Sequence, residues 1–254
     1  MKRLRRLATI VASIGIACAS ALAQVNVGAG SSWSLGDAAI DWGCSDVAVN
    51  GTLDVQAAVT ANADSVLING GGSVSGGTGT LGLTGDFTNN GTFAKGTGTV
   101  AIRDGCANTT STIAGSQSFN ALAVTTSTAK TLLFSADSTT SVGAGLLTLR
   151  GTAGNLLKIR STSPGSQARM FLNGTQNIGY VDVADNRGTL LVLAPGAPAA
   201  SNSVNSGNVM NWFDVLPIIP TLSTLGLILL GLIVAAFGVA RAGRKHNSTS
   251  GLAP

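Results

Sequence analysis

Aspartates are the residues of this chain best suited to chemistry, because Glu is absent and the single His, His246, stands near the C-terminus. General acid–base catalysis would therefore fall to Asp alone, as in glycoside hydrolases that use two carboxyl groups. The closest pairs are Asp41 with Asp46 and Asp182 with Asp185. Positions 182 and 185 would face opposite sides of one regular strand, which favours turn residues over a catalytic pair. We therefore expect no enzymatic activity and no catalytic residue.

Two cysteines, Cys44 and Cys106, stand in the central part of the chain. A disulfide between them would close a long loop and add about 4 kcal/mol of stability by the loop-entropy relation. Two unpaired thiols are the alternative. Two Cys without a nearby His do not make a metal site, and no Asp-x-Asp-x-Asp spacing suggests calcium. We expect no bound metal and no other cofactor.

Three tryptophans, Trp33, Trp42 and Trp212, allow two interpretations. An exposed indole face can stack on a sugar ring, which would make the chain a carbohydrate-binding module. The same three residues stand near the two ends of the central region, where large apolar side chains close the ends of a repetitive fold. The positions favour capping over sugar binding.

The elements that must position these residues are short strands. Charged residues make up only 10% of the 254 residues, Gly occurs 34 times, and Val, Leu and Ile recur in short runs. Runs of about four to six such residues alternate with Gly, Asn and Ser, and Asn-Gly pairs at 50–51 and 69–70 indicate tight turns through positive φ. No stretch of the central region shows a helical period, so we predict an all-β domain over residues 24–214.

An antiparallel sandwich and a parallel β-solenoid both fit this pattern, and loosely repeated phrases favour the solenoid. These phrases are TNNGTF (88–93), GTGTV (96–100), FNALAV (119–124), LTLR (147–150), LKIRSTSPG (157–165) and GYVDVAD (179–185). Through them, residues 85–190 resemble segments of large bacterial surface proteins that fold as right-handed parallel β-helices. We therefore predict a short right-handed parallel β-helix.

Residues 1–23 have the three parts of a secretory signal peptide. Basic residues at 2–6 precede the apolar run 7–17, and the small residues Ala21 and Ala23 predict cleavage before Gln24. An uncleaved membrane anchor is one alternative. A lipoprotein signal at Cys18 is a weaker one, because Gly15 stands where a bulky apolar residue is expected.

The C-terminal region predicts a membrane helix. Residues 222–240 are almost wholly apolar and uncharged, and 19 residues suffice to cross a hydrocarbon core about 30 Å thick. The basic cluster Arg241, Arg244 and Lys245 follows directly, which predicts a cytoplasmic C-terminus and places residues 24–214 outside.

A short motif stands before and at the start of this apolar run, at Ile219, Pro220, Thr221, Leu222, Ser223 and Gly226, and the basic cluster follows the run. This arrangement resembles the IPTL-CTERM protein-sorting domain, whose members are processed by exosortase-type membrane proteases. The family usually has an acidic residue where Thr224 stands and Trp where Leu225 stands. Pro220 keeps the segment before the helix extended, as a protease requires, although it would equally mark a simple helix boundary.

Together these patterns predict a signal peptide (1–23), a β-rich ectodomain (24–214), a sorting signal (215–245) and a short cytoplasmic tail (246–254). Residues 24–218 carry eight Lys and Arg against eleven Asp, a net charge of −3, which argues against nucleic-acid binding. We expect a structural or adhesive surface protein that begins as a single-pass inner-membrane precursor and ends at the cell surface or outside. Its expected partners are the export machinery, signal peptidase, membrane lipid and an exosortase-type protease; the resemblance adds extracellular polysaccharide. A carbohydrate-binding module is the alternative function, and a polysaccharide-degrading enzyme is a weaker third.

Overall fold

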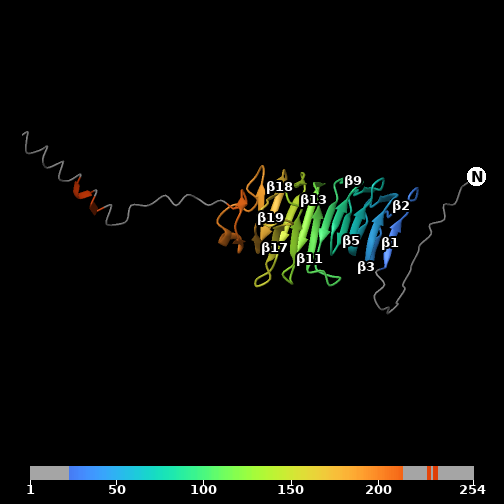
Figure 1. The fold of residues 1–254 in the computed structure, drawn as a ribbon, viewed down its shortest axis with the longest axis horizontal. Coiled ribbons are helices and arrows are strands. Elements are labelled where there is room, and N and C mark those ends of the chain that lie inside the picture. The colour runs from blue at the N-terminus through green and yellow to red at the C-terminus, as the bar shows by residue number, and fades with distance from the viewer. Residues whose placement is uncertain (1–22, 214–227, 230, 234–254) are drawn as a thin grey trace, which may run out of the picture. The chain divides into compact units, whose positions relative to one another are not determined.

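The computed structural model describes residues 23–213, 228–229 and 231–233. Residues 23–213 wind into a parallel β-solenoid of about eight turns (Figure 1). Every pairing between its strands is parallel. The predicted solenoid is therefore confirmed and the antiparallel sandwich is excluded, whereas the right-handed winding stays a prediction.

Each complete turn contributes a strand to three faces. Face 1 contains the first halves of β3 (Ala39–Val49) and β5 (Val59–Ile68), then β7 (Thr80–Leu83), β10 (Thr99–Ile102), β13 (Ala121–Thr125), β16 (Leu146–Arg150) and β19 (Thr175–Gly179). Face 2 contains β1 (Gln24–Val27), the second halves of β3 and β5, and β8 (Phe87–Asn89), β11 (Thr110–Ala114), β14 (Thr131–Phe134), β17 (Leu157–Ser161), β20 (Val181–Val183) and β22 (Val204–Asn205).

Face 3 is divided between a four-stranded and a five-stranded sheet. The first contains β2 (Ser32–Ser34), β4 (Thr52–Asp54), β6 (Ser73–Ser75) and β9 (Thr92–Ala94). The second contains β12 (Gln117–Phe119), β15 (Thr139–Val142), β18 (Ala168–Leu172), β21 (Asn186–Gly188) and β23 (Val209–Met210). A short 3₁₀ helix, η1 (Pro198–Ser201), precedes β22.

Apolar side chains fill the interior because alternate residues of each strand point inward. On face 2, Val47, Val66, Phe87, Ile113 and Phe134 stand in register in successive turns, and all are buried. The core cluster extends from Val27 to Phe213, so the solenoid contains a complete core of its own.

Three aromatic rings cluster in the core of the solenoid. Phe87 packs edge-to-face on Phe93 and on Phe119, with ring centroids 5.3 Å apart in both pairs. Such edge-to-face pairs add about 0.5–1.5 kcal/mol beyond the burial of their area. The rings come from faces 2 and 3, so they join two walls of the solenoid.

The Asn-Gly positions are corners, as predicted, but for a different physical reason. Neither Gly51 nor Gly70 has a positive φ. A Cβ on Gly51 would lie 2.3 Å from the carbonyl oxygens of Gly28 and Ser31 in the preceding turn. Glycine is needed at position 51 because successive corners stack closely, not because of its backbone angles.

The apolar run at residues 178–183 is divided between two strands. Tyr180 has a φ of 54° and ends the run, so Ile178 belongs to β19 on face 1 and Val181 begins β20 on face 2. A left-handed residue between two apolar runs carries the chain around a corner, and composition gives no sign of it.

Candidate functional site

One corner of the solenoid carries a loop that a disulfide joins to a distant turn. Residues 103–109 connect β10 to β11, and Cys106 within them forms a disulfide with Cys44, 62 residues earlier. Their Cα atoms lie 5.3 Å apart. Cys44 sits at the corner inside β3, three turns before the loop, so the bridge fastens the fourth complete turn to the first.

Lys130 lies beneath this loop and is fully buried. Its ammonium group donates hydrogen bonds to the carbonyl oxygens of Thr84, at 2.8 Å, and Asn108, at 2.5 Å. The side-chain amide of Asn108 in turn donates to a carboxylate oxygen of Asp64. Burial lowers the pKa of Lys130, and the carboxylates of Asp104, Asp86 and Asp64 oppose that shift. One side chain thus joins three successive corners of the solenoid.

Asp104, near the start of the same loop, connects the loop to the next turn. Its carboxylate accepts hydrogen bonds from the backbone N–H of Ser127, at 2.6 Å, and from the Ser127 hydroxyl, at 3.1 Å. Burial alone would raise the pKa of Asp104, but these bonds and those from the hydroxyls of Thr126 and Thr128 outweigh burial and lower it. Asp104 therefore acts as a fixed acceptor between two turns.

The candidate catalytic pair Asp41 and Asp46 is divided by a corner. Asp41 lies on face 1 opposite Ala61, and Asp46 lies on face 2 opposite Gln24. Asp41 accepts hydrogen bonds from the N–H of Gly43, at 2.8 Å, and from the amide of Asn62, at 3.0 Å. These contacts make Asp41 part of the corner.

Asp182 and Asp185 are also occupied by structural contacts. Asp182 lies on strand β20, where a turn was predicted, and its carboxylate accepts from the Arg160 guanidinium, at 2.6 Å, and the Ser206 hydroxyl, at 2.5 Å. Burial would raise the pKa of Asp182, but the bonds from Arg160 and Ser206 lower it. Asp185 has a φ of 53° and accepts from the amide of Asn208.

The tryptophans occupy different environments. Trp212 is fully buried near the end of the last turn, and its indole N–H donates to the side-chain oxygen of Asn186 at 2.9 Å. It therefore closes that end of the core. Trp42 is half-buried against the core, and Trp33 on β2, in the first turn, is 40% exposed.

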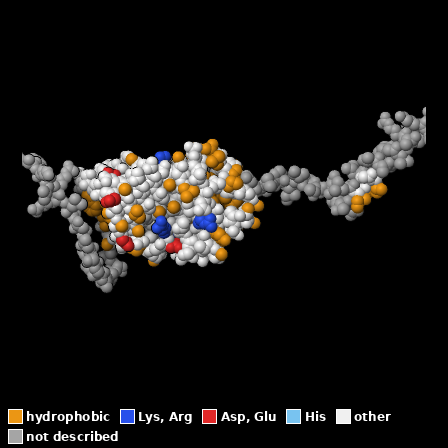
Figure 2. Space-filling view, turned by 180° about the vertical axis from the view of Figure 1, so that it is seen from behind, with side chains coloured by type: hydrophobic (Ala, Val, Ile, Leu, Met, Phe, Trp, Pro, Cys, Tyr) orange, Lys and Arg blue, Asp and Glu red, His pale blue; other side chains and the backbone are white. Residues whose placement is uncertain are grey.

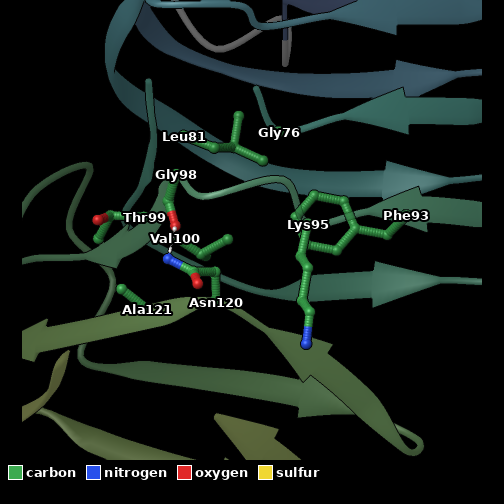
Figure 3. A pocket seen from close by; sticks show the side chains of 9 residues that line it. All are labelled: Gly76, Leu81, Phe93, Lys95, Gly98, Thr99, Val100, Asn120 and Ala121. Atoms are coloured by element: carbon green, nitrogen blue, oxygen red, sulfur yellow. Dashed lines mark hydrogen bonds between the residues drawn. The ribbon is translucent and has the colours of Figure 1, made fainter. Parts of the chain in front are cut away.

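The hollows of the described surface are small or shallow. Figure 3 shows a pocket where Phe93, Leu81 and Val100 meet Asn120, whose side-chain amide donates to the carbonyl oxygen of Gly98 at 3.4 Å. Its volume is about 10 Å³, room for a single water molecule.

Two wider hollows lie on the outside of the solenoid. A groove of about 250 Å³ on face 2 is lined by Gln24, Asp46, Asp86 and neighbours, and an open notch of about 470 Å³ lies between Arg103 and Arg150. Within the described residues, no group of three or more potential metal ligands occurs. These two hollows present polar and charged groups to solvent.

The predicted targeting residues fall mainly outside the described part of the chain. Ala21 and the signal peptide core lie there, as do the sorting residues 219–223 and 226 and the basic cluster 241–245. Ala23 and Gln24 are described, and Gln24 begins β1. No helix among the described residues is long and apolar enough to span a membrane. Most of the predicted membrane helix, residues 222–240, lies outside the described residues.

Comparison with known protein families identifies the C-terminal region. The model of the IPTL-CTERM motif matches residues 219–244. This chain carries the IPTL-CTERM motif. The motif indicates a protein sorted to the cell surface, and it implies processing by an exosortase-type membrane protease. No curated protein and no solved structure gave a significant match to the chain.

Sequence reasoning missed Lys130 and its loop. The only sequence signal is that Lys130 directly precedes the apolar strand 131–134, a position equally typical of an exposed edge.

Proposed function

We propose that the chain is an exported, non-enzymatic surface protein that an exosortase-type protease processes at its IPTL-CTERM motif. The mature product is then the β-solenoid, acting as a structural or adhesive element of the cell surface or extracellular matrix. The motif at 219–244 carries this proposal. Because it follows the solenoid in the chain, cleavage near it would release the solenoid with its core and disulfide intact.

The architecture supports a structural role. The four aspartates considered for catalysis do not converge: Asp41 and Asp46 lie on different faces, and Asp182 and Asp185 hold structural partners. Hydrogen bonds between successive turns and a disulfide make a rigid rod-like repeat suited to exposure outside the cell.

The decisive experiment is fractionation of producing cells combined with mass spectrometry of the C-terminal peptide. We expect a mature chain that ends near residues 219–223 and is found outside the inner membrane. Pro220→Ala should block this processing, whereas Pro217→Ala, just outside the matched region, should leave it intact. Persistence of residues 225–254 in the inner-membrane fraction would contradict the proposal and indicate a permanently anchored ectodomain.

Carbohydrate binding is the second candidate, because Trp33 exposes 40% of its surface. An exposed indole offers a stacking face for a sugar ring. A glycan array with the parent chain and Trp33→Ala tests this role, with Trp212→Phe as a control at a buried position. Equal binding by the parent and Trp33→Ala would exclude Trp33 as the contact.

A further inference from the structure

The first and last turns of the solenoid expose strand edges on the same two faces. The first turn consists of β1 on face 2 and β2 on face 3, and the last consists of β22 on face 2 and β23 on face 3. Within residues 23–213, β1 and β2 pair only with strands of the next turn, and β22 and β23 pair only with strands of the preceding turn. Among residues 23–213, face 1 has no strand in either terminal turn.

The hydrogen bonds of the first turn show which backbone groups point outward from its end. Ala23 and Val27 accept hydrogen bonds from Asp46 and Asn50 of the next turn. Because alternate residues of a strand in a parallel ladder bond to the same side, Gln24 and Asn26 of β1 present their N–H and C=O groups to the free edge. Leu35 donates to Asp54 of the next turn, which leaves Ser34 in the same outward position on β2.

The last turn follows the same alternation. The N–H of Ser206 donates to Val183, so Asn205 of β22 faces the free edge. Gly207 accepts from Asp185, so Met210 of β23 does likewise. Both ends therefore carry outward donors and acceptors that a further parallel strand on the same face could satisfy.

Within residues 23–213, the terminal strands lack the charged side chains and prolines that usually prevent such pairing. Natural proteins protect exposed strand edges with Lys, Pro or bulges. Residues 24–36 and 188–213 contain no Lys, Arg, Asp or Glu, and none of the four terminal strands contains Pro. Large apolar side chains are exposed instead: Trp33 in the first turn, and Leu190, Leu191, Val204 and Met210 in the last.

Charge is divided along the solenoid axis. Residues 24–94 hold six Asp and no basic residue, whereas residues 95–213 hold eight Lys and Arg against four Asp. On the face seen in Figure 2, most acidic side chains lie toward the end where the solenoid begins, and the basic side chains lie farther along. The first turns of one copy therefore attract the last turns of another, whereas like ends repel.

We propose that the solenoid binds a second copy of itself head to tail, with β22 and β23 of one copy pairing in parallel with β1 and β2 of the next. Trp33 of one copy then packs near the apolar residues around Met210 of the other. The contact joins two different surfaces and leaves one of each free, so it propagates into a filament rather than closing into a dimer. The proposal does not depend on sorting, because it concerns only the described solenoid.

The test is sedimentation of the full chain, purified in a neutrally buoyant detergent. The parent chain should form oligomers that grow with concentration and dissociate as NaCl rises, because screening weakens the charge attraction. Ser34→Pro removes an outward N–H from the first turn, and Met210→Pro does so from the last. Each variant alone should be monomeric, because every contact needs an intact first turn from one copy and an intact last turn from another.

A one-to-one mixture of the two proline variants should form dimers and nothing larger, because each variant keeps one intact end. Ser34→Ala and Met210→Leu leave the N–H groups in place and should assemble like the parent. If circular dichroism shows that either proline variant is misfolded, Asn26→Pro and Asn205→Pro serve at the same edges. A monomeric parent at every concentration, a mixture that stays monomeric, or proline variants that assemble like the parent would overturn the proposal.

Discussion

The ammonium nitrogen of Lys130 lies 2.8 Å from the carbonyl oxygen of Thr84, 46 residues earlier in the chain. Between them lies the turn that carries the 103–109 loop, whose Asn108 carbonyl oxygen accepts from the same ammonium group. A fully buried lysine is stable only when its donors are satisfied. Here its two carbonyl partners and the nearby Asp carboxylates make it a connection across three turns.

Lys130→Met should lower the free energy of unfolding by about 2–4 kcal/mol, because it removes two charge-assisted hydrogen bonds that join three turns. Urea denaturation followed by circular dichroism measures the change. Lys158→Met is the matched control: Lys158 is exposed on β17, and its replacement should change stability by no more than about 0.5 kcal/mol. Equal effects of the two substitutions would show that the Lys130 contacts add no stability.

Reduction of the Cys44–Cys106 bridge should release the 103–109 loop before the solenoid unfolds, because the bridge joins the loop to Cys44, three turns away. We expect a loss of about 2–5 kcal/mol, the range found when native disulfides are removed from small secreted domains. Thermal melts with and without dithiothreitol measure the loss, and limited proteolysis reports on the loop. The Cys44→Ala/Cys106→Ala variant should melt like the reduced protein and show no response to the reductant.

Gly72→Ala should destabilise the solenoid by about 1–3 kcal/mol, the usual cost of overpacking. The added Cβ would lie 2.1 Å from the carbonyl oxygen of Val49 in the preceding turn, so the stacked corners would have to separate. Gly28→Ala is the control, because its Cβ would meet only the Ser31 hydroxyl at an ordinary 3.7 Å. Thermal melts that do not distinguish the two variants would contradict the requirement for close corner stacking.

The solenoid was predictable from the sequence because its signals are local. Short runs such as 99–102 and 131–134 alternate with Gly and Asn, and each run became one strand of one turn. The resemblance covered residues 85–190 only, whereas the turns of the solenoid begin at Gln24. The first turns contain long strands bent at corners, as at Cys44, and local composition does not show such bends.

The corner loop was not predictable because its partners are distant in sequence. A lone Lys ordinarily indicates an exposed side chain. The two carbonyl groups that accept from Lys130 belong to residues 46 and 22 positions earlier in the chain, two turns and one turn away. The sequence positions of Cys44 and Cys106 were likewise compatible with either a disulfide or two unpaired thiols. Only the stacking of turns, about 4.8 Å apart, brings these groups together.

Acid should weaken the link between Arg160 and Asp182, which joins the last two complete turns. The folded state holds the pKa of Asp182 below its ordinary 3.8, so the unfolded chain takes up protons first as the pH falls. The stabilisation from Asp182 is therefore fully present above the unfolded pKa and is lost as the pH falls through 3.8 to the lowered folded value.

Asp182→Asn should therefore cost about 1–2 kcal/mol near neutral pH, where it removes the ion pair with Arg160 and weakens the bond from Ser206. Below the lowered pKa the variant and the parent should have nearly equal stability, because Asp182 is then protonated in both states. Urea denaturation at a series of pH values measures the difference. Asp137→Asn is the control: the Asp137 carboxylate is largely exposed and lies 3.9 Å from the Arg169 guanidinium, so its replacement should change stability by no more than about 0.5 kcal/mol. A stability difference for Asp182→Asn that stays constant from neutral pH to strong acid would show that the ionised carboxylate contributes nothing to this link.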